Sequence, residues 1–172
     1  MSNKLTAIVI FLSIFLIQNA FAQVKIGYTN PARILSELPE VEEVDKQIEA
    51  LITEKDQELA QKATDLQQIF TDYETGMGNL SEDERSSREE ELMQLNQQFE
   101  ADRENMMNEI RERRNELMEP IIEKMNVAME EVAEEMGLDL ILNEGTSYGD
   151  AIIFYASGEE LNITNKIIEK IK

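Results

Sequence analysis

Two long segments of the chain carry a narrow stripe of apolar residues at helical spacing. Between residues 41 and 73, and again between residues 92 and 136, apolar side chains recur every third or fourth position. The remaining positions are mostly charged or amide, a pattern that is typical of amphipathic helices. The sequence Gly76-Met77-Gly78-Asn79 separates the two segments and favours a turn. The sequence therefore predicts a long antiparallel helical hairpin.

The second helix of this hairpin has clear start and stop signals. Ser81 and Glu84 have the spacing of a capping box, in which each side chain bonds the backbone N–H of the other residue. Gly137 follows the stripe and suits the left-handed conformation that ends many helices. Pro120 interrupts the helix, and we expect a kink there. The apolar face broadens after Pro120, which predicts that the last part of the helix packs on a core.

Shorter apolar segments lie on both sides of the hairpin. Val24, Ile26 and Tyr28 alternate with other residues, which predicts a strand. Residues 138–142 predict a second strand. The continuous apolar run 151–155 predicts a third, buried strand, which could pair with the second across the loop between them.

The chain closes with a short predicted helix. Its start is marked by Asn162-Ile163-Thr164, and its apolar residues are Ile163, Ile167, Ile168 and Ile171. The segments outside the hairpin amount to about 70 residues, which is marginal for a stable core, so we expect oligomerisation.

The first 22 residues have the order of a secretory signal peptide. Lys4 precedes the 13-residue apolar run 5–17, and Ala20-Phe21-Ala22 supplies a cleavage site with small residues at its first and last positions. The run is short for a bilayer crossing, which needs about 20 apolar residues. We therefore predict export and cleavage after Ala22, and the alternative is an uncleaved anchor extending to Ala22. The mature chain would have 36 acidic and 15 basic residues, a net charge of −21.

The composition excludes several classes of function. The chain has no Cys, no His and no Trp. Zinc sites built on Cys or His, disulfide frameworks and catalytic triads with a His base are therefore excluded. The acidic balance argues against nucleic-acid binding, which depends on clustered Lys and Arg. Since neither a catalytic constellation nor a phosphate-binding loop is recognisable, we predict that the protein is not an enzyme and uses no cofactor.

Motifs at both ends of the mature chain resemble the Skp/OmpH family of periplasmic chaperones. The first runs from Lys25 to Asn30 and continues with Ile34-Leu35 and Pro39-Glu40. The second begins with Pro120-Ile121-Ile122-Glu123-Lys124-Met125 and leads to Gly137-Leu138-Asp139-Leu140-Ile141-Leu142-Asn143. Tyr155 and the segment 161–168 follow in the order of the family. The resemblance covers essentially the whole mature chain, with specific motifs at its ends and only a similar composition in the hairpin.

The resemblance implies a fold of the α+β class that is mainly α. In that fold a small β body, here residues 23–40 and 120–172, is built from three chains into a jellyfish-like homotrimer. A helical arm, here residues 41–119 with its tip at 76–81, extends from each chain. The arms enclose unfolded outer-membrane β-barrel proteins in the periplasm and prevent their aggregation without ATP.

One departure from the family concerns charge. Well-known members have basic arm tips that are linked to lipopolysaccharide or acidic lipid. Here the arm holds 23 acidic and nine basic residues, and residues 76–84 contain no base. Binding of lipid or lipopolysaccharide is therefore not expected.

Two sets of residues are candidates for function. The exposed parts of the second stripe are predicted to contact clients, namely Leu92, Leu95, Phe99, Met106, Met107 and Ile110. Apolar strand residues are predicted to form the oligomer contacts, namely Val24, Ile26, Tyr28, Leu138, Leu140, Leu142, Ile152 and Phe154. No catalytic or metal-binding residue is predicted, because the runs of carboxylates are better explained as solvated helix faces.

A structural coiled-coil adaptor or spacer of the cell envelope is the alternative function. It would require a tight seam between the helices and a defined partner. Lys55 and Lys62 fall on or beside the first stripe, and we expect them to weaken such a seam. The identity of the clients, the effect of the acidic arms on client choice and the size of the cavity are not predicted by the sequence.

Overall fold

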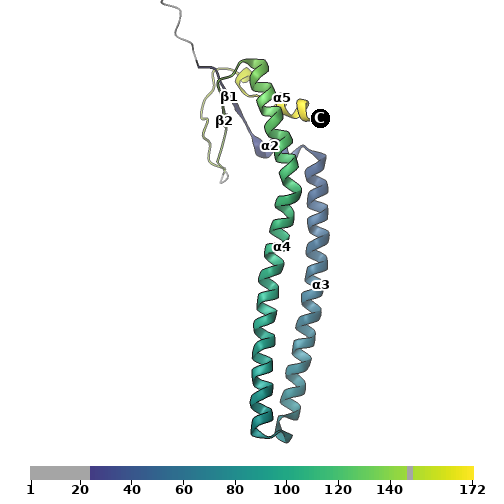
Figure 1. Ribbon diagram of the computed structural model, residues 1–172. Coiled ribbons are helices and arrows are strands. Elements are labelled where there is room, and N and C mark those ends of the chain that lie inside the picture. Colours follow the sequence, from purple (N-terminus) through teal and green to yellow (C-terminus); the bar gives the residue numbers. More distant parts are fainter. Residues whose placement is uncertain (1–23, 147–148) are drawn as a thin grey trace, which may run out of the picture. The chain divides into compact units, whose positions relative to one another are not determined.

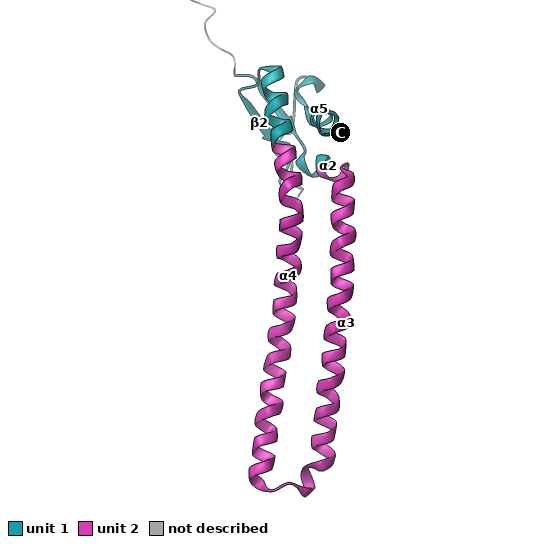
Figure 2. Cartoon of the chain, turned by 45° about the vertical axis from the view of Figure 1, so that its right-hand side comes forward, with its two compact units in different colours: residues 1–34, 127–172 teal, residues 35–126 magenta. Residues whose placement is uncertain are grey.

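The computed structural model describes residues 24–146 and 149–172 (Figure 1). The predicted signal peptide, with its cleavage after Ala22, lies outside the described residues. The chain divides into two compact units (Figure 2). Unit 1 comprises the residues up to 34 and those from 127 onward, and unit 2 comprises residues 35–126. Within the described part, no helix combines the length and the apolarity that a membrane crossing requires.

Unit 2 is a helical hairpin. Its first helix, α3, spans Pro39–Gly76, and its second helix, α4, spans Glu82–Met136 and continues into unit 1. The turn between them contains the short 3₁₀ helix η1, Met77–Asn79. At 1.5 Å per residue α3 is about 57 Å long. The predicted pair of helices and the turn at Gly76 are thus present, and α3 begins two residues before the first residue of its stripe.

Both ends of α4 form as predicted. The Ser81 backbone N–H donates to Glu84 Oε2 at 2.9 Å, and the Glu84 backbone N–H donates to Ser81 Oγ at 3.4 Å. The bonds from Ser81 hold the pKa of the Glu84 carboxyl below its ordinary value. At the other end Gly137 has φ +62°, and the Leu138 N–H donates to the Ala133 carbonyl at 2.9 Å. This bond and the left-handed glycine form a Schellman cap.

The environment of α4 changes at Pro120. The helix runs through this proline without ending. Between Glu82 and Pro120, a stretch that the structure describes completely, Leu92 is the only buried residue. In the shorter part that follows, four residues are buried, namely Ile121, Met125, Ala128 and Val132. The predicted broadening of the apolar face therefore corresponds to a real increase in burial.

The sheet of unit 1 has two parallel strands. Strand β1, Ile26–Thr29, pairs with β2, Leu140–Asn143, so that Ile26 lies opposite Leu140 and Thr29 lies opposite Asn143. Both strands were predicted, but the pairing of β2 with residues 151–155 is wrong. Parallel strands need a long crossover connection, and here α2 (Pro31–Ser36) and the entire hairpin supply it.

Residues 151–155 correct the prediction of a third buried strand. The segment contains one isolated bridge, between Gly145 and Ala151, and no strand. Its first residues are held by the Glu144 carbonyl, which accepts hydrogen bonds from the N–H groups of Ile152 and Ile153 at 2.8 and 3.2 Å. Phe154 is 90% exposed and Tyr155 is 85% exposed. In the part of the chain that the structure describes, four of the five residues of this run are exposed, and Ile153 has intermediate burial.

The core of unit 1 is built around the last helix, α5, Thr164–Ile171. A second 3₁₀ helix, η2 (Glu159–Leu161), precedes it. Ile163, Ile167, Ile168 and Ile171 are buried, as are Ile34 of α2 and Val132 of α4. Thr29 and Thr164 share a buried hydrogen bond of 3.3 Å between their hydroxyls. A Cβ at Gly27 would lie 2.7 Å from Leu138 Cδ1, so a larger residue at this close approach would displace the Leu138 side chain.

Candidate functional site

Polar bridges cross the helical hairpin at several levels. Glu40 accepts from Lys124 at 2.8 Å near the open end, and Asp45 accepts from Arg114 at 2.9 Å further along. The next two bridges join Lys55 to Glu109 at 3.0 Å and Lys62 to Asp102. The Tyr73 hydroxyl donates to Glu89 Oε1 at 2.7 Å near the turn. The residue numbers fall on one helix as they rise on the other, so these bridges fix the antiparallel register.

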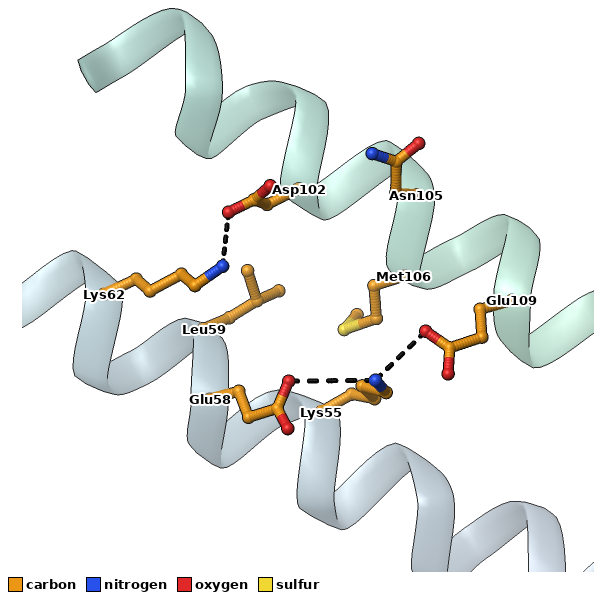
Figure 3. Close-up of a pocket in the computed structure, with 8 residues that line it drawn as sticks. All are labelled: Lys55, Glu58, Leu59, Lys62, Asp102, Asn105, Met106 and Glu109. Carbon is orange, nitrogen blue, oxygen red and sulfur yellow. Dashed lines mark hydrogen bonds and ion pairs between the residues drawn. The ribbon is translucent and has the colours of Figure 1, made fainter.

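Lys55 and Lys62 lie at the seam between the two helices, and their weakening of that seam stays a prediction. Each lysine reaches across to a carboxylate of α4, with Leu59 and Met106 between the two ion pairs (Figure 3). Hydrogen bonding to Glu109 raises the pKa of Lys55, and hydrogen bonding from Lys62 lowers the pKa of Asp102. The seam is thus partly ionic. The signal that sequence reasoning missed is the acidic residue facing each lysine in the antiparallel register.

A small hollow of about 160 Å³ lies at this level of the hairpin. Leu59 and Met106 point toward each other across it, and the four charged groups of the two bridges flank them (Figure 3). The charged groups are bonded to one another in two ion pairs. The hollow separates two thinly packed helices and has no arrangement of nucleophile and base.

The structure places the predicted client-contact residues at different depths. Leu92 is 8% exposed, and Met107 is 57% exposed. Four others have intermediate burial, namely Leu95, Phe99, Met106 and Ile110. Met107 is therefore the member of the set that is most open to another molecule. Leu92 contributes mainly to the hairpin itself, and client contact by the set stays a prediction.

Four of the predicted oligomer contacts lie on one face of the sheet. In a parallel pair, opposed residues share a face, so Ile26 and Leu140 lie together, as do Tyr28 and Leu142. Ile26 is 41% exposed and Leu140 is 47% exposed. The remaining members are Val24, Ile152 and Phe154, which are exposed, and Leu138, which has intermediate burial. Unit 1 thus presents an apolar face that a single chain leaves in water.

Charged groups provide no recognisable metal centre in the part of the chain that the structure describes. No group of three or more carboxylates there is arranged to hold a metal ion. The ion pairs are all at least partly exposed, with Lys55 and Asp102 among the more enclosed members, at 21% and 20% exposure of their side chains. Such pairs tune the stability of the helices rather than create a reactive site.

Comparisons with known proteins identify a family and a solved structure of similar fold. A family model described as "Outer membrane protein (OmpH-like)" matches residues 25–171. The fold is similar to the crystal structure of a protein described as an outer membrane chaperone (OmpH-like) from Caulobacter crescentus. That match has a TM-score of 0.68 and 11% sequence identity, and it covers 87% of this chain and 85% of the other. No curated protein matches the sequence.

Proposed function

The chain belongs to the OmpH-like family of outer membrane proteins, and from this premise we propose that it is an ATP-independent holdase chaperone. Its clients are unfolded outer-membrane β-barrel proteins, which it holds in the periplasm between helical arms until they fold. The observation that carries this proposal is the sparse exposure of apolar side chains along helices that are otherwise charged. Such a surface makes many weak contacts and fixes no single client conformation.

The first part of the proposal is a homotrimer built through unit 1. The exposed face around Ile26 and Leu140, together with Phe154, supplies the apolar surface that an obligate interface needs. The segment 151–155 has strand-forming residues but no strand partner in the described part of its own chain. A neighbouring chain would provide that partner, and the small unit would gain the core that one chain lacks.

The second part concerns client contact by the hairpin. Methionine is flexible and polarizable, so it adapts to apolar side chains of many shapes. Met107 is the strongest candidate because more than half of its surface is open. Two other members of the set, Met106 and Ile110, would contribute to client binding through the parts of their side chains that are exposed beside the seam. The surrounding carboxylates keep the wall hydrated and prevent the arms from adhering to one another.

The same charges argue against lipid or lipopolysaccharide as a partner. Between residues 41 and 119 the chain has 14 more acidic than basic residues, since 23 − 9 = 14. An anionic lipid surface would repel such a helix pair, and no proposal of lipid binding is made. Export through the signal peptide of residues 1–22, with cleavage after Ala22, would deliver the protein to its clients.

A dilution experiment tests the proposed function. The protein, purified after export of its full-length precursor, is mixed with a urea-unfolded outer-membrane barrel protein and the urea is then diluted. We expect light scattering by the client to be suppressed and a complex of three chains with one client to elute on sizing with multi-angle scattering. Unchecked aggregation beside a well-folded protein would contradict the proposal and favour an adaptor or spacer.

Two variants locate the client contact within this experiment. Replacing Met106, Met107 and Ile110 with Ser should weaken client capture severalfold while helix content and oligomeric state are unchanged. Gln97→Ser is the matched control, because it alters an exposed position on the same helix without removing apolar surface. Equal capture by the triple variant and the control would contradict the assignment of these residues.

A further inference from the structure

An apolar groove lies at the tip of the hairpin. It has a volume of about 330 Å³ and is formed by the last turns of α3, the residues after η1 and the first turns of α4. Its apolar lining comes from Ile69, Tyr73, Leu80 and Leu92. This volume lies at the low end of the range for small-ligand pockets, about 300–1,000 Å³. The groove is therefore large enough to receive a bulky side chain.

Hydrogen bonds shape the groove before any ligand arrives. The Tyr73 hydroxyl donates to Glu89 and ties α3 to α4 beside the groove. The Arg85 guanidinium donates to the Met77 carbonyl at 3.2 Å and holds the turn. The capping box of Ser81 and Glu84 fixes the start of α4. A preformed groove loses little conformational entropy on binding, which favours affinity.

The charged residues that line the groove are Asp72, Arg88 and Glu91, and the tip of the hairpin around them is strongly acidic. From residue 69 to residue 92 the chain has eight carboxylates and two arginines, a balance of −6. Both arginines are already engaged, since Arg85 bonds the Met77 carbonyl and Arg88 pairs with Glu91. Four other carboxylates of the tip, outside the lining of the groove, have no cation within ion-pair distance among the described residues, namely Glu74, Glu82, Asp83 and Glu90. The apolar floor of the groove thus belongs to a tip with a net negative charge.

We propose that this tip groove binds an aromatic or branched aliphatic side chain of an extended polypeptide segment in which Lys or Arg flank that side chain. The floor receives the apolar group, and the net negative charge of the tip attracts the flanking cations. The inference rests on the proposed holdase function, because an unfolded client supplies such segments. It adds a selection rule to that function: segments with apolar and basic residues are bound at the tip in preference to apolar and acidic ones.

Charge complementarity favours a polypeptide as the occupant of the tip groove. Anionic lipid head groups would be repelled by the acidic tip, whereas a cationic peptide would be attracted at distances up to the Debye length, about 10 Å at 0.1 M salt. The contribution of charge to the affinity for the peptide should therefore fall as the salt concentration rises, while the contribution of the apolar floor should remain.

Single-cysteine probes can place a peptide at the tip, because the native chain has no cysteine. Met77→Cys puts an environment-sensitive fluorophore beside the groove, and Met107→Cys puts the same fluorophore midway along α4. Both methionines are exposed, at 44% and 57%. We expect an unstructured peptide of alternating Phe and Lys to change the signal at position 77 at concentrations at least tenfold lower than at position 107. A peptide with Glu in place of Lys should bind at least tenfold more weakly.

A second pair of variants tests the groove without a label. Ile69→Ser removes part of the floor, and Ile52→Ser is its matched control on the same helix, since the two isoleucines are 37% and 39% exposed. We expect Ile69→Ser to weaken binding of the Phe/Lys peptide at least fivefold, measured by anisotropy, and Ile52→Ser to leave it within twofold.

The outcomes separate this inference from the function on which it rests. The tip groove would be overturned if Ile69→Ser and Ile52→Ser bound the Phe/Lys peptide equally well, or if the Lys and Glu peptides bound with equal affinity. If the protein still suppressed client aggregation, the proposed holdase function would stand. Binding of the Phe/Lys peptide at the tip without any suppression of aggregation would support the groove and overturn the holdase. Binding of anionic vesicles at position 77 would also overturn the proposed occupant.

Discussion

Unit 1 and the helical hairpin of unit 2 bury their apolar residues to very different extents. In unit 1 a short helix of eight residues, α5, contributes three buried isoleucines, and Ile163 immediately before it adds a fourth. In the hairpin, six apolar side chains are buried over residues 35–126, and five of them lie near its open end. These five are Leu38, Val44, Ile48, Ile121 and Met125, and the sixth is Leu92 near the tip.

The difference shows how little packing a helix pair needs. A helix satisfies its backbone hydrogen bonds within itself, so the middle of the hairpin can persist with a thin seam and ionic bridges. A two-stranded sheet cannot do so, and unit 1 depends on its isoleucine core and on covering its apolar face. Apolar burial is thus concentrated in unit 1 and at the open end of the hairpin, and exposed surface predominates along the rest of unit 2. Four experiments can break or sharpen this comparison.

The largest effect is expected from a cavity in unit 1. Ile167→Ala empties part of a completely buried site and should lower the free energy of unfolding by about 3 kcal/mol. Ile52→Ala in the exposed hairpin should change it by less than about 0.5 kcal/mol. Urea unfolding followed by circular dichroism measures both, with hydrogen exchange to assign the change to a unit. Equal losses would mean that the two units are stabilised alike.

Loss of the cap at the hairpin tip should have a smaller, local effect. Ser81→Ala removes the hydroxyl that accepts the Glu84 N–H and should cost about 1 kcal/mol. Since the cap lies at the end that has little core, faster amide exchange should be confined to the first turns of α4. Spread of the faster exchange into α5 would show that tip and core are linked.

Removing an ionic bridge should have a still smaller effect. Lys62→Gln breaks the bridge to Asp102 and should lower the urea midpoint of the hairpin slightly at 0.02 M salt, with no difference from the parent at 1 M salt. Lys46→Gln, which breaks a pair within α3, is the matched control. An effect that persists at 1 M salt would indicate that Lys62 acts through packing of its stem.

The pH dependence of Asp102 provides the finest test. Hydrogen bonding from Lys62 lowers its pKa, so the stabilisation is present above the unfolded-state pKa, about 3.9, and is lost as pH falls through the lower folded-state pKa. The parent should therefore be slightly more stable than Asp102→Asn at pH 7, and the difference should shrink below about pH 4. Urea midpoints at pH 7, 5 and 3 measure it. A difference that grows toward pH 3 would contradict the assigned direction.

Several parts of the site could be predicted because their signals are local. The capping box depends on two residues three positions apart, and the stop at Gly137 depends on one glycine and its neighbours. The partners of Lys55 and Lys62 were missed because a narrow stripe specifies a face of a helix but not the register between two helices. The tip groove was missed for the same reason, since Ile69 and Leu92 meet only when the turn is folded.

The sequence by itself determined the hairpin, from α3 through the turn at Gly76 to the cap at Gly137, because helical periodicity, turns and caps are properties of neighbouring residues. Only the tertiary structure decided that β1 pairs in parallel with β2, across a connection that includes the whole hairpin. It also decided that residues 151–155 form no strand and are mostly exposed rather than buried. Strand pairing depends on partners distant in sequence, and burial depends on everything that surrounds a side chain. Neither is encoded in a local pattern.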